Sequence, residues 1–436
     1  MLFHQTSHIA YTLSGDILLT IIGFFVLFLL GVPVWISLGV TAYFLLFFSE
    51  VIPIVLIGES MFAGLDAFPL IAVPLFILTG DAMVRTGLSG RLLDIAEACM
   101  GWVKSGFGTS TVLGCGFFSC ITGSDAAGAA AMGRIAQDRL VQKGYPPAYA
   151  AALIASGSCT GILIPPSIGY IIIGLVMGIS VSTLFTAAIL PGIVVLLSIM
   201  IANVFVNRFT NFENSTEKFD IRILYRALYK GKYAVAVPFL ILGGIYSGVF
   251  TPTEAAGVAV VFIISIGLIQ KSISFNDIPN MLLSSVKVNG IIVPIIALSL
   301  PVAQALSLIQ IPQQIVANLT EISSDPIFLI AVMLGVFVIA GAFMEAAPNI
   351  VILGPLLLPL ALEIGMSEIH FCIFMLTTLG LGFITPPLGI NLFVLSAITG
   401  IPSTSISVYA VPFMVSMLIA AIVIVSFPWL SLVFIS

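Results

Sequence analysis

The sequence predicts an all-α polytopic membrane protein. Its 436 residues are 60% hydrophobic and only 8% charged, with a mean hydropathy of +1.24, whereas soluble domains carry roughly 25% charged residues. Apolar runs of bilayer-spanning length follow one another along the chain. Because lipid leaves no partner for an unpaired backbone group, we expect these runs to be helices. The five cysteines and three histidines show no metal-ligand spacing, and we expect no organic cofactor and no nucleic-acid partner.

Two similar six-residue stretches interrupt apolar runs. The first, Gly-Ile-Leu-Ile-Pro-Pro, spans residues 161–166, and the second, Gly-Phe-Ile-Thr-Pro-Pro, spans residues 382–387. Each proline pair removes backbone donors and pushes the preceding residue out of the α region, so both helices must break in mid-membrane. One such break could be a packing kink. Two in matched positions indicate a binding site, because unwound backbone at membrane depth survives only inside protein or beside a cavity.

A stretch of small and apolar residues precedes the first break. Gly106 to Met132 has basic residues at both ends, Lys104 before it and Arg134 after it. Both ends are therefore expected on the cytoplasmic side, and 27 residues are too few for two crossings of about 20 residues each. We predict a re-entrant helical hairpin at about 105–134. Its tip, Thr-Gly-Ser-Asp at residues 122–125, lies at membrane depth.

The second half of the chain repeats this order. Residues 326–363 form a second hairpin candidate with a polar break at residues 344–349, and only acidic residues flank it. All fourteen Lys and Arg lie between Arg85 and Lys287, so this hairpin should enter from the outer side. The two proline pairs lie 221 positions apart. Element order, offset and opposite flanking charge together predict two inverted-topology repeats, the architecture of secondary transporters.

The predicted domains follow this division. The first repeat is 1–230, with its hairpin at about 105–134 and its broken helix at about 149–178; the second is 231–436, with its hairpin at about 326–363 and its broken helix at about 369–398.

The remaining elements are assigned by apolar length and charge. In chain order they are spans at 17–30 and 34–48, an interfacial segment at 53–66, a span at 68–84, an amphipathic segment at 88–103, a span at 184–206, a hydrophilic linker at 208–232, spans at 234–249 and 255–269, an amphipathic segment at 275–287, a span at 291–308, an interfacial segment at 312–321 and a last span at 406–433.

The freed backbone groups at each break predict the chemistry of the site. Broken helices expose carbonyl oxygens, which suit hard cations such as sodium, and new helix starts, which suit anions. We expect each hairpin tip to lie against the break of its own repeat. The first predicted sodium site uses Thr122, Ser124 and Asp125 with the carbonyls of Gly161, Ile164 and Pro165; the second uses Gly341 and Glu345 with Gly382, Thr385 and Leu388; a substrate carboxylate would face Ser124, Ala126, Ser167, Pro348 and Gly389.

Two of these residues have an equally strong alternative. Asp125 could cap the return arm of its hairpin by accepting from the N–H of Ala127 or Gly128, and Glu345 could cap the other return arm in the same way. An ionisable group at membrane depth is nevertheless a functional candidate by default.

Three motifs in this order resemble a known family. Thr122-Gly123-Ser124, the run from Gly161 to Ser167 and the run from Gly382 to Gly389 are similar to motifs of the large membrane subunit of tripartite ATP-independent periplasmic (TRAP) transporters, the DctM type. The resemblance covers essentially the whole chain. It implies sodium-coupled uptake of an organic acid, such as a C4-dicarboxylate or a sialic acid, by an elevator-like motion of the hairpin-bearing domain.

The resemblance also implies location and partners. These are the bacterial inner membrane, a small four-helix membrane subunit and a periplasmic substrate-binding protein. In many relatives the first tip is Ser-Gly-Ser followed by a small neutral residue, whereas this chain has Thr122 and Asp125. We expect Asp125 to tighten the first cation site or to add proton sensitivity.

Two other functions compete with this interpretation. A stand-alone divalent-anion/sodium symporter shares the repeats and hairpins but needs no binding protein. An intramembrane aspartyl protease would use Asp81 and Asp125 as its acid pair, but the sequence lacks the Gly-x-Gly-Asp spacing. The chain also has no P-loop lysine motif for ATP coupling. We therefore expect a transporter and no enzyme.

Overall fold

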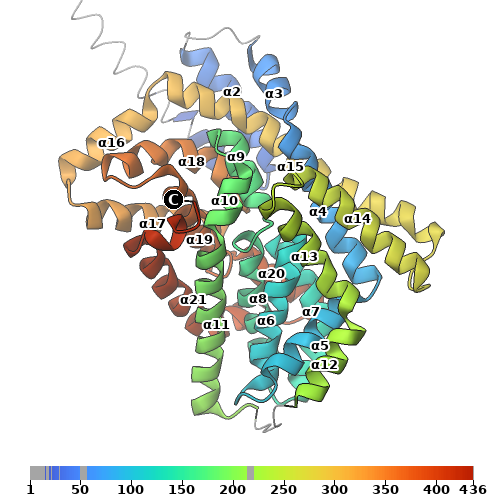
Figure 1. The fold of residues 1–436 in the computed structure, drawn as a ribbon. Coiled ribbons are helices and arrows are strands. Elements are labelled where there is room, and N and C mark those ends of the chain that lie inside the picture. The colour runs from blue at the N-terminus through green and yellow to red at the C-terminus, as the bar shows by residue number, and fades with distance from the viewer. Residues whose placement is uncertain are drawn as a thin grey trace, which may run out of the picture.

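The computed structural model is built of helices (Figure 1). It describes residues 15, 19–20, 22–28, 30–49, 56–213 and 220–435, and these ranges contain no strand. Seven helices within them are long and apolar enough to cross a membrane. They cover Phe68–Arg85, Ile189–Thr210, Pro252–Ile269, Phe275–Leu308, Pro326–Phe343, Ala346–Glu363 and Ser403–Ser426. The prediction of an all-α polytopic membrane protein is thereby confirmed.

Both predicted hairpins are helix pairs with very short connections. Hairpin 1 consists of α6 (Gly106–Thr122) and α7 (Asp125–Gln142), joined by two residues. Hairpin 2 consists of α17 (Pro326–Phe343) and α18 (Ala346–Glu363), also joined by two residues. In Figure 1 hairpin 1 lies in the lower half of the molecule and α17 and α18 lie at the left, above α21.

Both helices that carry a proline pair are interrupted. The first consists of α8 (Pro147–Ser158) and the short η2 (Cys159–Ile162), and it resumes as α9 (Ile168–Met177). The second consists of α19 (Glu368–Gly382) and α20 (Ile390–Thr399). We call residues 163–167 break 1 and residues 383–389 break 2. Each contains a cis peptide bond between its two prolines.

The remaining helices surround these four elements. They are α2 (Val34–Ser49), α3 (Leu56–Leu65), η1 (Phe68–Ile71), α4 (Ala72–Arg85), α5 (Leu88–Met100), α10 (Val181–Ala187), α11 (Ile189–Thr210), α12 (Ile221–Lys230), α13 (Lys232–Tyr246), α14 (Pro252–Ile269), η3 (Phe275–Asp277), α15 (Ile278–Leu308), α16 (Ile311–Ile322), α21 (Ser403–Ser426) and α22 (Trp429–Leu432). Helix α15 packs against α2, α3 and α4, whereas α11 packs against α21.

Three boundaries differ from the sequence-based prediction. The amphipathic segment 275–287, apart from η3 at its start, and the span 291–308 form one long helix, α15. This helix continues through Gly290, and the Asn289 side chain donates to the Ser285 carbonyl along it. The last span ends at Ser426, where Pro428 prevents continuation. The hydrophilic linker contains the helix α12. The predicted span 17–30 lies only partly within the described residues. The predicted interfacial segment 53–66 is described from residue 56 onward.

Candidate functional site

The tip of hairpin 1 lies directly against break 1. The backbone N–H of Ile168, which starts α9, donates to the carbonyl of Gly123 at 3.0 Å. A Cβ atom on Gly161 would lie 2.7 Å from the Asp125 backbone nitrogen, closer than packed atoms tolerate. Gly123 itself has φ +62°, and a Cβ there would lie 2.7 Å from the Pro166 carbonyl oxygen. Glycine is therefore required on both sides of this contact.

Hairpin 2 meets break 2 in a similar way. The N–H of Gly389 donates to the carbonyl of Ala342 at 3.1 Å. A Cβ atom on Gly382 would lie 2.6 Å from the Cα atom of Gly341, so these two backbones are in direct contact. In both halves of the chain the tip region of the hairpin therefore contacts the break of the same half, as expected from the sequence.

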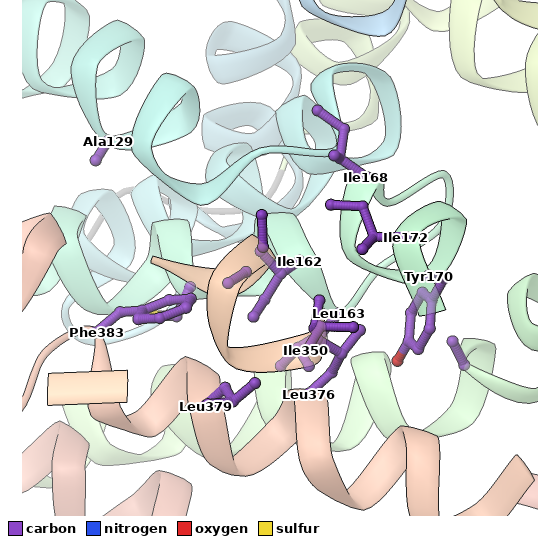
Figure 2. Close-up of a cluster of buried hydrophobic side chains, with 14 of the residues drawn as sticks. Ala129, Ile162, Leu163, Ile168, Tyr170, Ile172, Ile350, Leu376, Leu379 and Phe383 are labelled. Carbon is purple, nitrogen blue, oxygen red and sulfur yellow. The ribbon is translucent and has the colours of Figure 1, made fainter. Parts of the chain in front are cut away.

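The two interrupted helices also contact each other. Asn391, in the first turn of α20, donates through Nδ2 to the carbonyl of Ala155 and toward the Cys159 sulfur, each at 3.3 Å. Figure 2 shows apolar side chains from both interrupted helices, among them Ile162 and Phe383, gathered in one buried cluster. The centre of the molecule is thus formed by both halves of the chain.

Several acceptor oxygens at this centre form no hydrogen bond within the described residues. They include the backbone carbonyls of Ile164, Pro165 and Leu388. Gly382, a predicted ligand, already accepts from the Thr385 N–H at 2.9 Å, which leaves one lone pair of its carbonyl. The side-chain oxygens of Asn349 and Asn391 are buried without a partner. Buried oxygens without donors are the groups that a hard cation binds.

The two carboxylates of the predicted sites do not act as the proposed caps. Ser124, rather than Asp125, caps α7 by accepting from the Ala127 N–H at 3.4 Å. Asp125 is only 3% exposed and lies within electrostatic reach of Glu345. Glu345 occupies the N-cap position of α18 but its side chain accepts no capping hydrogen bond. The N–H of Gly128 donates to the Ser124 carbonyl at 3.0 Å. The capping alternative is therefore wrong for Glu345, and for Asp125 with both donors that it named.

The residues predicted to face a substrate are mostly buried. Ser167 is fully buried, and its hydroxyl donates to the Ile162 carbonyl at 2.7 Å across break 1. The N–H of Gly389 is used by hairpin 2. Pro348 is buried in the first turn of α18, and Ala126 is half-buried in that of α7. The Ser167 hydroxyl and the Gly389 N–H are therefore not free to bind an anion in this arrangement.

Sequence reasoning missed the two asparagines. Asn349 donates through Nδ2 to the carbonyls of Met344 and Glu345, at 3.0 and 3.1 Å, and so holds the tip of hairpin 2 together. Asn391 links α20 to α8 and η2, and so joins the two interrupted helices. Each is an amide inside an apolar helix, and a buried amide needs hydrogen-bond partners. Asn391 lies two residues after Gly389 and Asn349 four residues after Glu345, so their positions near the predicted site could have indicated a role.

Asp81 does not pair with Asp125. Its carboxylate forms an ion pair with Arg85 at 2.8 Å, one turn away on α4. An aspartyl protease needs two carboxylates that share a proton, so this pairing removes the geometric basis of the protease alternative.

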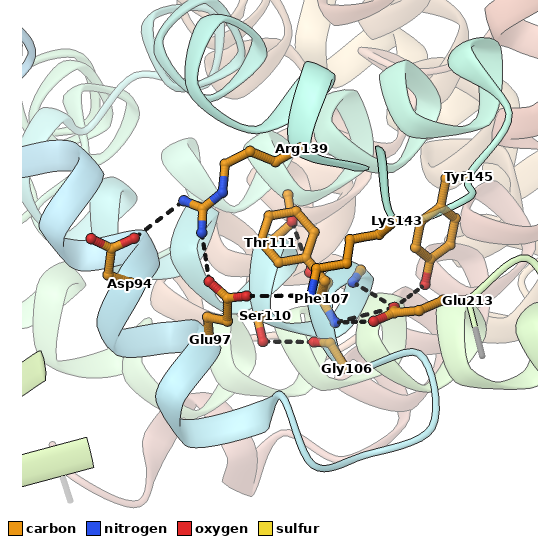
Figure 3. Close-up of polar contacts among 11 residues, drawn as sticks. Asp94, Glu97, Gly106, Phe107, Ser110, Thr111, Arg139, Lys143, Tyr145 and Glu213 are labelled. Atoms are coloured by element: carbon orange, nitrogen blue, oxygen red, sulfur yellow. Dashed lines mark hydrogen bonds and ion pairs between the residues drawn. The ribbon is translucent and has the colours of Figure 1, made fainter. Parts of the chain in front are cut away.

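The foot of hairpin 1 carries a polar network (Figure 3). Glu213 is 1% exposed, and its carboxylate accepts from the backbone N–H of Phe107 at 3.0 Å, from that of Gly108 at 3.3 Å and from the Tyr145 hydroxyl at 2.9 Å. Burial, and then the Glu213 carboxylate, raise the pKa of the Tyr145 phenol far above its usual range, so it remains a donor. Glu213 thereby caps α6 from outside the helix.

A second part of this network joins hairpin 1 to α5. Arg139 on α7 pairs with Asp94 at 3.2 Å and with Glu97 at 2.5 Å, and its guanidinium lies 4.9 Å from the ring centre of Phe107. Lys143 reaches Glu97 at 3.9 Å. These side chains are partly exposed, so the pairs orient the helices more than they stabilise them.

The fold and this centre define a polytopic helical membrane protein in which two hairpins meet two interrupted helices. The family model of the tripartite ATP-independent periplasmic transporter, DctM component, matches residues 21–430. The chain therefore belongs to the DctM family, and the resemblance seen in the motifs is confirmed.

Named relatives agree with this assignment. The chain is 36% identical over 374 residues to the C4-dicarboxylate TRAP transporter large permease protein DctM of Pseudomonas aeruginosa, which covers 86% of this chain and 87% of that protein. It is 31% identical over 414 residues to the isethionate TRAP transporter permease protein DctMQ of Oleidesulfovibrio alaskensis, covering 94% of this chain but only 65% of that longer protein.

A solved structure shares the fold. The YdaH transporter of Alcanivorax borkumensis superposes with a TM-score of 0.58 over 85% of this chain and 87% of that chain, at 13% sequence identity. At this identity the likeness concerns the fold alone.

Proposed function

We propose that this chain is the large permease subunit of a tripartite system that imports an organic acid across the bacterial inner membrane, driven by the sodium gradient. The observation that carries the proposal is the meeting of two hairpins and two proline breaks around acceptor oxygens without donors. Sodium is the cation we assign to both predicted sites, because carbonyl and hydroxyl oxygens are hard ligands. Membership of the DctM family supports the same function.

The inverted repeats and the elevator motion belong to this proposal. The two tip contacts, Ile168 with Gly123 and Gly389 with Ala342, have similar donors and acceptors in the two halves, as a duplicated fold requires. A hairpin bonded to its own broken helix would move with it as one body. The surrounding helices α2, α4, α13, α14 and α15 would form the fixed scaffold.

Substrate class and partners follow from the named relatives. Their names include C4-dicarboxylate, isethionate and 2,3-diketo-L-gulonate transport, and all three substrates are anionic organic acids. The chain has no Lys or Arg after Lys287, so helix starts and bound sodium would have to balance the substrate charge. We assign a small membrane subunit and a periplasmic binding protein as partners.

Reconstitution tests this function directly. Vesicles that contain the permease with its small subunit would be given a sodium gradient, a labelled C4-dicarboxylate and the cognate binding protein, with isethionate and 2,3-diketo-L-gulonate as the next acids. The expected result is accumulation that requires both sodium and the binding protein. Uptake without the binding protein would favour the stand-alone symporter. Uptake driven by a proton gradient but not by sodium would overturn the sodium assignment.

A further inference from the structure

Helix α12, in the segment predicted as a plain hydrophilic linker, has three distinct faces. Three basic side chains, Arg222, Arg226 and Lys230, recur at four-residue spacing and so form one row. An apolar row is formed by Ile221, Tyr225 and Leu228, which are 63%, 72% and 40% exposed. The described structure covers neither row.

The third face of α12 packs against the rest of the protein. Leu224, Ala227 and Gly231 follow helical spacing on the side between the other two rows. A Cβ atom on Gly231 would lie 2.6 Å from the end of the Ile95 side chain of α5, so the two helices are in close contact here. Arg91 of α5 also donates to the carbonyl of Lys230 at 3.1 Å. Helix α12 is therefore held in place while its apolar and basic rows remain open.

The direction of α12 suits a helix that lies on a membrane. It makes an angle of 72° with α13, and the two together are apolar enough to count as a bent span. If α13 crosses the bilayer, as the sequence predicts for residues 234–249, this angle places α12 close to the membrane plane. No acidic residue lies between Ile221 and Lys232, and Asp220 is engaged as the N-cap through the Arg222 N–H at 2.8 Å. Figure 1 shows α12 beside α5 at the lower end of the molecule.

We propose that α12 binds the anionic phospholipid of the cytoplasmic leaflet, with its apolar row in the acyl region and its basic row on the phosphates. Amphipathic helices with cationic and aromatic side chains bind membrane surfaces in this way. Each basic residue near an anionic surface contributes roughly fivefold to affinity. Lys232 extends the positive charge and lies 5.1 Å from the ring centre of Tyr229.

The contact reaches hairpin 1 through α5. Helix α5 holds α12 through Arg91 and holds α7 through the ion pairs of Asp94 and Glu97 with Arg139. Bound lipid would thus fix the frame against which hairpin 1 is anchored. This consequence for transport rests on the proposed function, whereas lipid binding by α12 does not.

Binding is tested by fluorescence without any transport assay. Tyr225→Trp places an indole on the apolar row, and the signal of the parent protein with its three native tryptophans is subtracted. Vesicles would contain brominated phosphatidylglycerol in unbrominated phosphatidylcholine, or the reverse. The expected result is quenching by the anionic lipid that exceeds its mole fraction severalfold. Equal quenching by the two lipids, or none by either, would overturn the proposal.

Charge variants then test the basic row. Arg222→Gln with Arg226→Gln removes two exposed charges without touching the α5 contact, and the severalfold preference for phosphatidylglycerol should be lost. The matched control, Lys271→Gln with Lys287→Gln, removes two charges elsewhere and should leave it unchanged. A preference that survives in the first variant, or is lost in the control, contradicts the assignment. The uptake rate is compared separately in anionic and zwitterionic vesicles. If lipid binding is confirmed but the uptake rate is the same in both, the coupling of α12 to hairpin 1 is contradicted.

Discussion

The two hairpin and break pairs share their backbone contacts but differ in their surroundings. Break 1 is almost entirely buried, and the Ser167 hydroxyl closes it by donating to the Ile162 carbonyl. In break 2 the residues from Pro386 to Leu388 are exposed. The same local geometry can therefore be enclosed in one half of the chain and open in the other. If both breaks bind sodium as proposed, the second site exchanges its ion more readily.

The first prediction tests whether the two contacts are equivalent. Gly161→Ala and Gly382→Ala each force a Cβ into backbone that cannot move aside, at 2.7 and 2.6 Å. Overpacking of this kind costs about 1 to 3 kcal/mol. If this cost falls on the transport-competent conformation, the population of that conformation decreases by roughly 5- to 150-fold. We expect sodium-driven uptake to fall by at least about fivefold in both variants.

Matched alanine substitutions provide the control for this test. Gly128→Ala in hairpin 1 and Gly380→Ala three residues before break 2 meet only ordinary contacts, at 3.7 Å or more. Both should retain uptake near that of the parent. Loss in only one of the two test variants would show that the tip contacts are not functionally equivalent.

The second prediction concerns the two carboxylates. Asp125→Asn removes a buried charge from the enclosed site, and Glu345→Gln a half-buried one from the more open site. We expect the half-saturating sodium concentration to rise severalfold for Asp125→Asn and less for Glu345→Gln, because the less solvated charge attracts a cation more strongly. Sodium titrations of uptake measure both.

Proton competition distinguishes the roles further. In the parent protein the half-saturating sodium concentration should rise as the pH falls, because protons and sodium compete for the Asp125 carboxylate. Asp125→Asn should abolish this dependence. An unchanged sodium and pH response in that variant would contradict the assigned role.

The sequence predicted more of this arrangement than of its environment. The proline pairs and the small residues of the first tip are local signals, so the breaks and hairpins follow from them directly. The unbroken helix α15 was not predicted, because the polar stretch near Lys287 and Gly290 is typical of a boundary between an amphipathic segment and a span, whereas the helix continues through it with these residues exposed. The role of Asn391 was also hidden, since its partners Ala155 and Cys159 lie more than 230 positions away. Such long-range contacts have no local pattern.

The third prediction compares how the first helix of each hairpin is capped. Glu213 caps α6 with a buried carboxylate that is shared by two backbone N–H groups and Tyr145, whereas Asp325 caps α17 at the surface through the Ile327 N–H at 3.1 Å. Glu213→Ala leaves buried donors unpaired and should lower the free energy of unfolding by at least about 2 kcal/mol. Asp325→Ala should cost about 1 kcal/mol. Detergent unfolding titrations would measure the difference, and equal costs would show that burial does not set the strength of the cap.

The smallest expected effect concerns ion pairs that, among the residues the structure describes, hairpin 1 forms and hairpin 2 does not. Arg139 is 36% exposed and its partner Asp94 is 59% exposed, so solvent screens the attraction and Arg139→Gln should cost no more than about 1 kcal/mol. This cost should shrink further at about 1 M salt, where the screening length is about 3 Å. Hairpin 2 ends at Glu363, and no Lys or Arg follows Lys287 in the sequence, so Glu363→Gln should show no such salt dependence. A double-mutant cycle with Asp94→Asn isolates the Arg139–Asp94 pair. A cost of Arg139→Gln that persists undiminished at high salt, without coupling to Asp94, would mean that Arg139 acts mainly through its contact with the Phe107 ring.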